Sequence, residues 1–306
     1  MFAKKIPIFF ESIFILVLFI LCTTSLISCR IEKPDTASAA LAILNKHPAD
    51  YINQLVTLDA LISKEMHLSL THDNSNSPLP LSLADSLYQF ANLLKPNMLL
   101  AQSDTEKIAL FNSFIFDSLG LKAIDDTLDI RSSLPSQILI HRQGSCLGLV
   151  LFSLGLAEFL KLPLSPVFLP GHIFLRYQSP THISNIEMLK RGIARSDSFY
   201  RTQFNLAAKP WYQMENYSKD QALIALLFNL ANFHMYEKKW AQALDEYQVV
   251  LTILPRYPEA LANAGAALYS LGDKKSAKIK LDSAFIGDSL APPTLKNLEL
   301  LNSQIL

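Results

Sequence analysis

The sequence feature that most limits the possible folds is the segment CLGLVLFSLGLAEFL at 146–160, which is apolar at almost every position. A helix that is apolar all round has to be buried on every side, so this segment predicts a central helix that the rest of the fold surrounds. Ser145, a preferred N-cap residue, precedes the segment and places Cys146 in the first helical turn. The fold therefore has to hold a cysteine at the N-terminus of its central helix.

The chain of 306 residues has 27 lysines and arginines against 27 aspartates and glutamates, and half of its residues are hydrophobic. This composition predicts a large core. Because there is neither a net charge nor a basic run, nucleic acid is not expected as a partner.

The N-terminus, residues 1–28, resembles a bacterial secretory signal. Lys4 and Lys5 form a positive start, an apolar run follows at 13–21, and small polar residues end the segment. The alternative is a transmembrane anchor, because the stretch at 6–27 is nearly long enough to span a bilayer.

The end of this segment, LISC at 26–29, resembles the lipobox of bacterial lipoproteins, in which cleavage precedes a cysteine that then carries lipid. Cys29 is therefore predicted as the lipid attachment site and as the contact with the membrane. The resemblance implies the bacterial cell envelope, and Arg30 in place of an aspartate after Cys29 indicates the outer membrane.

Cysteine usage singles out Cys146. Cys22 lies in the predicted signal and Cys29 is assigned to the lipid, so Cys146 is the only free thiol predicted in the mature chain. Exported proteins usually pair their cysteines. An unpaired one is either a small buried apolar residue or a residue kept for its chemistry, and both interpretations apply to Cys146 at this point.

Helical patterns precede the central helix, and strand-like segments follow it. The segments LSPVFL at 164–169, HIFLRY at 172–177 and HISNIEML at 182–189 are short, and the second alternates along its length. The turns between them suit hairpins. Helices followed by an antiparallel sheet predict an α+β fold.

The last third of the chain contains an internal repeat with a period of 34 residues. This period is typical of tetratricopeptide repeats, in which two helices pack closely in each repeat. Two such repeats are predicted, at 224–257 and 258–291, and their concave surface is expected to bind a protein or peptide. The matching pairs are Asn229 with Asn263, Ala243 with Ala277, Tyr247 with Leu281 and Leu251 with Phe285.

Cys146 could act as a nucleophile if a base adjoined it. The dipole and the free amides of a helix N-terminus favour a thiolate and could hold an oxyanion. Among seven histidines, His172 is the preferred base, because it opens an alternating strand after a turn that can return it to the start of the central helix. Glu187 on the next strand could fix its tautomer, with His182 and Asp197 as rivals for that role.

These residues lie in motifs that resemble the bacterial transglutaminase-like superfamily, in particular its SirB-like branch, which is often joined to tetratricopeptide repeats. The resemblance covers roughly 51–206. Its most specific parts are G-x-C-L at 144–147, LPGH-x-F-x-R at 169–176 and NIE at 185–187. The family implies a papain-like α+β core with a triad of cysteine, histidine and aspartate or glutamate.

Carried over position by position, the resemblance implies Cys146 as nucleophile, His172 as general base and acid, and Glu187 as the orienting carboxylate. Many relatives have aspartate where this chain has Glu187, and an exposed strand carboxylate is the alternative for it. Gln143, just before the turn, is a candidate oxyanion donor, as in papain-like enzymes. Arg176 is expected in a buried ion pair rather than in substrate binding.

No metal and no cofactor are expected. His141 could join Cys146 and His172 around zinc, but the sequence offers neither a second nearby cysteine nor a close pair of histidines on one helix face.

The predicted parts of the chain and the predicted function follow from these observations. We expect a cell-envelope lipoprotein whose Cys146 forms an acyl-enzyme, for amide hydrolysis of the protease or amidase kind rather than for cross-linking. The alternative is a non-catalytic envelope scaffold that binds partners through its repeats. The parts are a lipoprotein signal peptide at 1–28, a tether and first helix at 29–50, a transglutaminase-like domain at 51–206, a linker at 207–223, the two repeats at 224–291 and a capping helix at 292–306.

Overall fold

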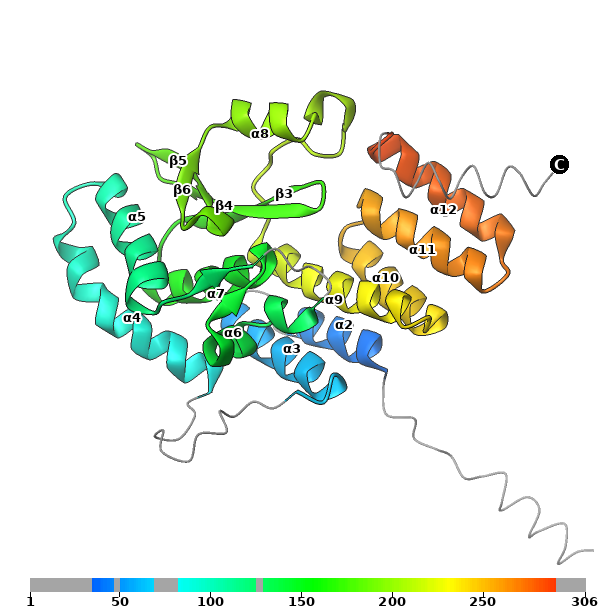
Figure 1. Cartoon of the computed structure of the whole chain (residues 1–306), viewed down its shortest axis with the longest axis horizontal. Helices are drawn as coiled ribbons and strands as arrows, with labels where there is room; N and C mark the ends of the chain where they lie inside the picture. Colours follow the sequence, from blue (N-terminus) through cyan, green and yellow to red (C-terminus); the bar gives the residue numbers. More distant parts are fainter. Residues whose placement is uncertain (1–34, 47–49, 69–81, 125–128, 290–306) are drawn as a thin grey trace, which may run out of the picture. The chain divides into compact units, whose positions relative to one another are not determined.

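Helices come first, an antiparallel sheet follows, and further helices end the part of the chain that the computed structural model describes, residues 35–46, 50–68, 82–124 and 129–289 (Figure 1). This order confirms the predicted α+β class. The predicted signal at 1–28, Cys29 and the predicted capping helix at 292–306 lie outside these residues. The helices are α2 (Thr36–Lys46), α3 (Tyr51–Glu65), α4 (Leu83–Leu100), α5 (Asp104–Ser113), α6 (Pro135–His141), α7 (Cys146–Leu160), α8 (Asp197–Gln203), α9 (Lys219–Tyr236), α10 (Trp240–Ile253), α11 (Pro258–Ser270) and α12 (Lys274–Gly287). The strands are β1 (Lys122–Ala123), β2 (Gln143–Gly144), β3 (Leu164–Leu169), β4 (His172–Gln178), β5 (Ile183–Glu187) and β6 (Ile193–Arg195).

Helix α7 occupies the centre of the fold, as its sequence predicts. Every residue from Cys146 to Ala157 is buried. The helix contacts α3, α4, α6 and α9 as well as strands β3 and β4. It ends at Leu160, where Lys161 adopts the left-handed conformation with φ of 55°. A helix without a polar face is stable here because neighbours cover it on all sides.

The sheet is an antiparallel meander in the order β3-β4-β5-β6. Leu169 pairs with His172 across the first turn, and Glu187 pairs with Ile193 across the last. Strand β6 is absent from the sequence prediction, because three residues are too few to show an alternating pattern. The meander places His172 and Glu187 on adjacent strands.

Both faces of the sheet are covered, and β4 lies between α7 and α8 (Figure 1). Ile173, Leu175 and Tyr177 belong to the main core together with α7. Phe174 points to the other face, where it joins a second cluster with Tyr200 of α8. This alternation along β4 is the period-two pattern of its sequence.

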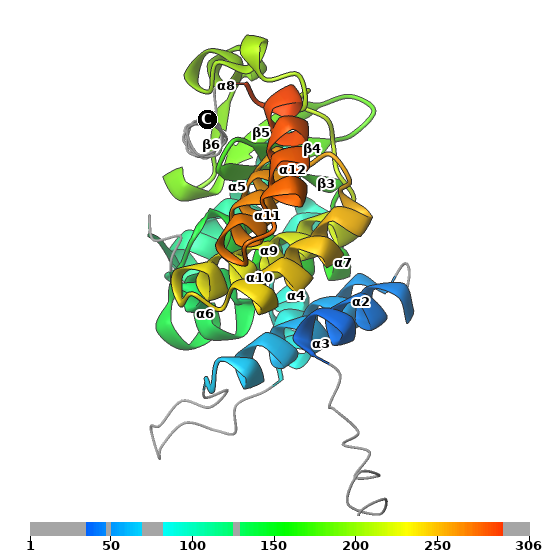
Figure 2. The same cartoon turned by 90° about the vertical axis from the view of Figure 1, so that its right-hand side faces the viewer.

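The C-terminal helices α9 to α12 pack against one another in chain order, and Figure 2 shows α11 and α12 side by side next to α9 and α10. Helix α9 begins at Lys219, inside the stretch predicted as a linker, because Ser218 and Gln221 form a capping box there. Gly265 lets α11 and α12 approach closely, since a Cβ at this position would lie 2.8 Å from the Leu281 side chain. Helix α9 also contacts α3, α7 and β3, so these helices pack on the α+β part of the chain.

The described residues from Thr36 onward form one compact unit. Among the described residues, no helix combines the length and the apolar character needed to cross a membrane.

Candidate active site

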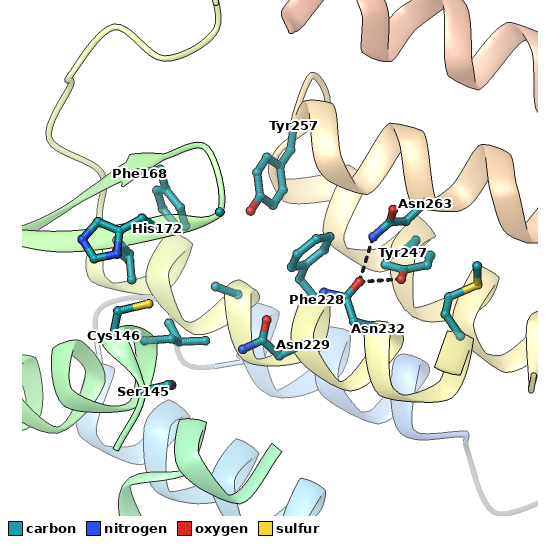
Figure 3. A pocket seen from close by; sticks show the side chains of 15 residues that line it. Ser145, Cys146, Phe168, His172, Phe228, Asn229, Asn232, Tyr247, Tyr257 and Asn263 are labelled. Carbon is teal, nitrogen blue, oxygen red and sulfur yellow. Dashed lines mark hydrogen bonds between the residues drawn. The ribbon is translucent and has the colours of Figure 1, made fainter. Parts of the chain in front are cut away.

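Cys146 begins α7 and opens on a pocket of about 390 Å³ (Figure 3). Ser145 is the N-cap, and its hydroxyl accepts a hydrogen bond from the Gly148 amide at 3.3 Å. Gly148 has to be glycine, because a Cβ would lie 2.2 Å from the carbonyl oxygen of Ser132. The tight approach of that carbonyl, which also accepts the Ser145 amide at 2.8 Å, holds the start of α7 and with it the thiol.

His172 is the first residue of β4 and lies against Cys146 in the pocket (Figure 3). The preceding Gly171 has φ of 63°, a conformation that glycine adopts without strain, and it turns the chain into the strand. The imidazole stacks on the Phe204 ring with a centroid distance of 5.7 Å and an interplanar angle of 9°. Its Nε2 lies 2.9 Å from an oxygen of Glu187, which leaves Nδ1 for the Cys146 sulfur.

Glu187 ends β5 and is buried. Its Oε2 lies 2.9 Å from His172 Nε2 and accepts a hydrogen bond from the Tyr200 hydroxyl at 3.0 Å. Its Oε1 accepts the Leu189 amide at 3.1 Å. The carboxylate therefore has three partners, and the imidazole it faces is held in one orientation.

The electrostatics of these three residues favour an ionised pair. Burial alone would lower the pKa of His172, but its hydrogen bonds to Cys146 and Glu187 and the negative charges of both raise that pKa from 6.5 to about 9. Burial would likewise raise the pKa of Glu187, yet the hydrogen bond and positive charge of His172, with the Leu189 amide and the Tyr200 hydroxyl, lower it. An imidazolium held beside a sulfur is the arrangement that stabilises a thiolate.

The start of α7 also offers donors for an oxyanion. The amides of Cys146 and Leu147 belong to the first turn of the helix, where N–H groups have no carbonyl partner within the helix. The sequence-predicted donor Gln143 is placed differently: it lies exposed in β2, outside the residues that line the pocket. Its oxyanion role stays a prediction.

The rival third members, Asp197 and His182, contact other residues. Asp197 forms an ion pair with Arg176 at 2.8 Å, and Arg176 also bonds Asn185 at 2.7 Å. Arg176 is buried, as expected, but the Asp197 side chain is 50% exposed, so the ion pair is only partly buried. His182 contacts the edge of the Tyr177 ring instead. In the described part of the chain, no group of three or more His, Cys, Asp or Glu side chains is arranged to hold a metal ion.

Sequence reasoning missed two groups of residues at this site. Tyr200 of α8 bonds Glu187, and Phe204, the C-cap residue of α8, stacks on His172. The far wall of the pocket comes from the C-terminal helices, which the sequence analysis treated only as a partner-binding module. The 34-residue match of Asn229 with Asn263 was the available signal. The residues on this wall include Phe228, Asn229, Asn232, Tyr247, Tyr257 and Asn263.

Comparisons with known proteins give two relatives and one family model that match this chain. Two relatives, each named "UPF0162 protein", come from Xylella fastidiosa strains 9a5c and Temecula1 / ATCC 700964. Each is 25% identical to this chain, over 237 and 236 residues respectively, which is 74% of this chain and 84% of the relative. Their names state no activity. Residues 82–197, which include Cys146, His172 and Glu187, match the family model of the transglutaminase-like superfamily.

Proposed function

We propose that this protein is a cysteine acyl-transfer enzyme of the transglutaminase-like class, with Cys146 as nucleophile. The observation that carries the proposal is the convergence of three groups at one pocket: Cys146 at a helix N-terminus, the His172 imidazole beside it, and Glu187 bound to the other ring nitrogen at 2.9 Å. The match of residues 82–197 to the transglutaminase-like model supports it.

The mechanism uses these groups in turn. The Cys146 thiolate attacks the carbonyl carbon of an amide, and a C–S bond forms while the first-turn amides of α7 hold the oxyanion. The imidazolium of His172 gives its proton to the amide nitrogen, the C–N bond breaks, and the amine leaves. His172 then takes a proton from water, which attacks the thioester, and the C–S bond breaks to return the thiolate and release a carboxylic acid.

Glu187 acts through His172 in this proposal. By accepting from Nε2 it keeps Nδ1 toward the sulfur, and its charge stabilises the imidazolium. Hydrolysis is the proposed outcome because water suffices as acceptor; an amine in its place would give transamidation by the same steps.

The experiment is alkylation of Cys146 by iodoacetamide between pH 5 and pH 10, followed by mass spectrometry. We expect rapid alkylation near pH 7 in the wild type and a rate lower by roughly a hundredfold or more in His172→Ala, because the thiolate loses its proton partner. The Cys146→Ala variant identifies the labelled residue, and His182→Ala is the matched histidine control.

A wild-type rate that rises only near the pKa of an ordinary thiol, about 8.5, and is equal in His172→Ala would contradict the proposal. That result would favour the non-catalytic scaffold. A second arm tests acylation: brief incubation with p-nitrophenyl acetate is expected to place an acetyl group on Cys146 in the wild type and to leave the Cys146→Ala variant unlabelled.

We also propose that α9–α12 form two tetratricopeptide-like repeats that bind a protein or peptide. Helices α10 and α12 begin at Trp240 and Lys274 and end at Ile253 and Gly287, both pairs 34 residues apart, and this spacing supports the proposal. Repeats contact only their neighbours, so α12 at the end is expected to exchange its amide hydrogens faster than α9. Equal protection of both helices would count against repeat packing.

The lipid anchor is a further part of the proposal. The LISC motif supports acylation of Cys29 and a place in the bacterial cell envelope, at the outer membrane. Mass spectrometry of the mature N-terminus is expected to find acyl chains on Cys29, and Cys29→Ala is expected to leave the outer-membrane fraction. An uncleaved N-terminus would indicate the transmembrane anchor instead.

A further inference from the structure

One face of α9 forms the wall of the pocket opposite Cys146 (Figure 3). Its residues recur at the spacing of one helical face, and three of them are apolar. The other two, Asn229 and Asn232, carry carboxamides. Side chains that merely filled space between packed elements would be apolar, so these two positions call for a chemical explanation. The five residues are Ala225, Phe228, Asn229, Asn232 and Met235.

The orientation of the Asn232 amide is determined by its neighbours. Its Oδ1 accepts hydrogen bonds from the Tyr247 hydroxyl at 2.6 Å and from Asn263 Nδ2 at 2.8 Å, as Figure 3 shows. In this network the atom that faces both neighbours is the amide oxygen, and the Tyr247 hydroxyl and Asn263 Nδ2 are its donors. Within the described residues Nδ2 of Asn232 has no hydrogen-bond partner, and its N–H groups are available to the pocket.

The side-chain amide of Asn229 is oriented the other way, with its nitrogen bonded and its oxygen free to face the pocket. Its Nδ2 donates to the Ser133 hydroxyl at 3.0 Å, and that hydroxyl lies 3.1 Å from the hydroxyl of Ser145, the N-cap of the cysteine helix. Oδ1 of Asn229 is therefore left as an acceptor, on the wall of the pocket that faces Cys146 (Figure 3). One turn of α9 thus presents a fixed donor and a fixed acceptor, which together complement an amide group.

Away from Cys146 and His172, the residues that line the pocket carry no charged side chain. Apart from His172 and Cys146, its lining contains no lysine, arginine, aspartate, glutamate or histidine. The tyrosines stay neutral, because burial raises the pKa of Tyr247 and of Tyr257. The negative charge of Glu259 also acts on Tyr257. A charged ligand group would lose its hydration here without gaining an opposite charge.

We propose that this pocket binds an uncharged, amide-bearing segment of the substrate, with Asn232 donating to its carbonyl oxygen and Asn229 accepting from its N–H. The rings of Phe168 and Phe228 flank the apolar part of the segment. The proposal rests on the function proposed above and adds what the enzyme selects. It assigns two specificity-determining residues to helix α9, outside residues 82–197 that match the family model.

The test uses iodoacetamides that carry an N-alkyl chain of equal length and end in a carboxamide, a carboxylate or an ammonium group. The rate of Cys146 alkylation by each is divided by the rate with unsubstituted iodoacetamide. We expect the carboxamide probe to exceed the carboxylate and ammonium probes by about tenfold, the value of one well-formed hydrogen bond together with the cost of burying an unpaired charge.

The sharpest variant is Asn232→Asp. The new carboxylate still accepts from Tyr247 and Asn263, so the packing is kept, but the donor toward the pocket becomes an acceptor with a negative charge. We expect this variant to lose the carboxamide preference and to favour the ammonium probe. Asn97→Asp, on the exposed side of α4, adds the same charge away from the pocket and is expected to keep the wild-type order.

Equal normalised rates for the three probes, or the same preference in Asn232→Asp as in the wild type, would overturn the proposal. Either result can arise while unsubstituted iodoacetamide still shows the dependence on His172, so failure here is distinct from failure of the proposed function. A fourth probe ending in an N-methylamide separates the two sources of an amide. Retained preference assigns a main-chain peptide bond, and a lost preference assigns a side-chain carboxamide.

Discussion

The described part of the molecule contains two histidine–glutamate pairs in its interior, and they differ in exposure and in surroundings. His172 Nε2 lies 2.9 Å from Glu187, and His234 Nδ1 lies 2.9 Å from both oxygens of Glu246. The first pair opens on the pocket, and the His172 side chain is 12% exposed. The second is enclosed, with both side chains 1% exposed.

The pKa values of the two glutamates shift in opposite directions. Burial raises the pKa of Glu246, and the nearby charges of Glu65 and Asp245 add to this, so the bond to His234 does not offset it. Burial acts on Glu187 in the same sense, but its bonds to His172, Leu189 and Tyr200 prevail and lower its pKa. The number of donors around a buried carboxylate therefore decides which form is favoured.

The second pair joins helices that are far apart in the sequence. Glu65 of α3 lies 4.0 Å from His234 and accepts from Gln242 and Thr36, so the pair connects α9 and α10 to α2 and α3. It has no neighbouring thiol, since Cys146 is the free cysteine of the described chain. A histidine–carboxylate pair thus indicates an active site only where a nucleophile and a cavity adjoin it.

The largest effect is expected when one partner of the enclosed pair, His234 and Glu246, is removed. Glu246→Ala leaves His234 buried without its acceptor and is expected to lower the free energy of unfolding by about 3–5 kcal/mol. Urea unfolding measures the loss, and the alkylation rate of Cys146 in the folded fraction is expected to stay at the wild-type value. Glu246→Gln, which keeps an acceptor, should fall between. A loss well below 1 kcal/mol would contradict the structural role of this pair.

The open pair, His172 and Glu187, is expected to make the free energy of unfolding depend on pH. The folded state holds a proton on His172 up to about pH 9, whereas the unfolded chain releases it near 6.5. The stabilisation is complete below pH 6.5 and is lost as the pH rises through about 9, at a cost of about 3 kcal/mol. Urea unfolding of His172→Gln is expected to lack this loss.

The enclosed pair provides the control for that measurement. The pKa of Glu246 is raised, so its contribution to stability also falls as the pH rises, but from the ordinary value of 4.5 upward. Glu246→Gln is expected to remove this earlier loss and to leave the loss between pH 6.5 and 9. If Glu246→Gln removed the later loss as well, the assignment to His172 would be wrong.

A smaller effect is expected from neutralising the carboxylate of the open pair. Glu187→Gln removes the charge that stabilises the imidazolium, so the pKa of His172 is expected to fall from about 9. If that pKa falls by about one pH unit, alkylation of Cys146 is expected to slow by up to about tenfold, because the imidazolium that stabilises the thiolate is less populated. The imidazole is followed by NMR and the thiol by iodoacetamide, with Glu246→Gln as control. An unchanged His172 titration would remove Glu187 from the proposed triad.

Local signals explain which features could be predicted from the sequence. Helix α7 was predictable because its apolar run and Ser145 cap are contiguous, and strands β3 to β5 because their turns and alternation are. The structure brings Cys146, His172 and Glu187 together, as their spacing along those elements suggested. Each of these inferences needs only the neighbouring residues.

The missing features depend on packing between distant segments. Asn229 and Asn232 reach the pocket because α9 packs on α7 and β3, and no local pattern encodes that contact. Gln143 shows the reverse case. It directly precedes the G-x-C-L motif in the sequence, yet in the short β1–β2 pairing its side chain is exposed. Position along the chain suggested a role for Gln143 that stays a prediction, and it gave no indication of Asn229 and Asn232.

Tyr200 could not be identified from the sequence either, and its substitution is expected to give the smallest effect. Tyr200→Phe removes the hydroxyl that donates to Glu187 at 3.0 Å but keeps the ring, which stacks on Phe174 at 4.2 Å. With one donor fewer the pKa of Glu187 is expected to rise and alkylation of Cys146 to slow by about threefold, since one of several hydrogen bonds is lost. Tyr88→Phe, at an exposed position of α4, is the matched control. Equal rates in all three proteins would mean that His172 and the Leu189 amide position the carboxylate without the Tyr200 hydroxyl.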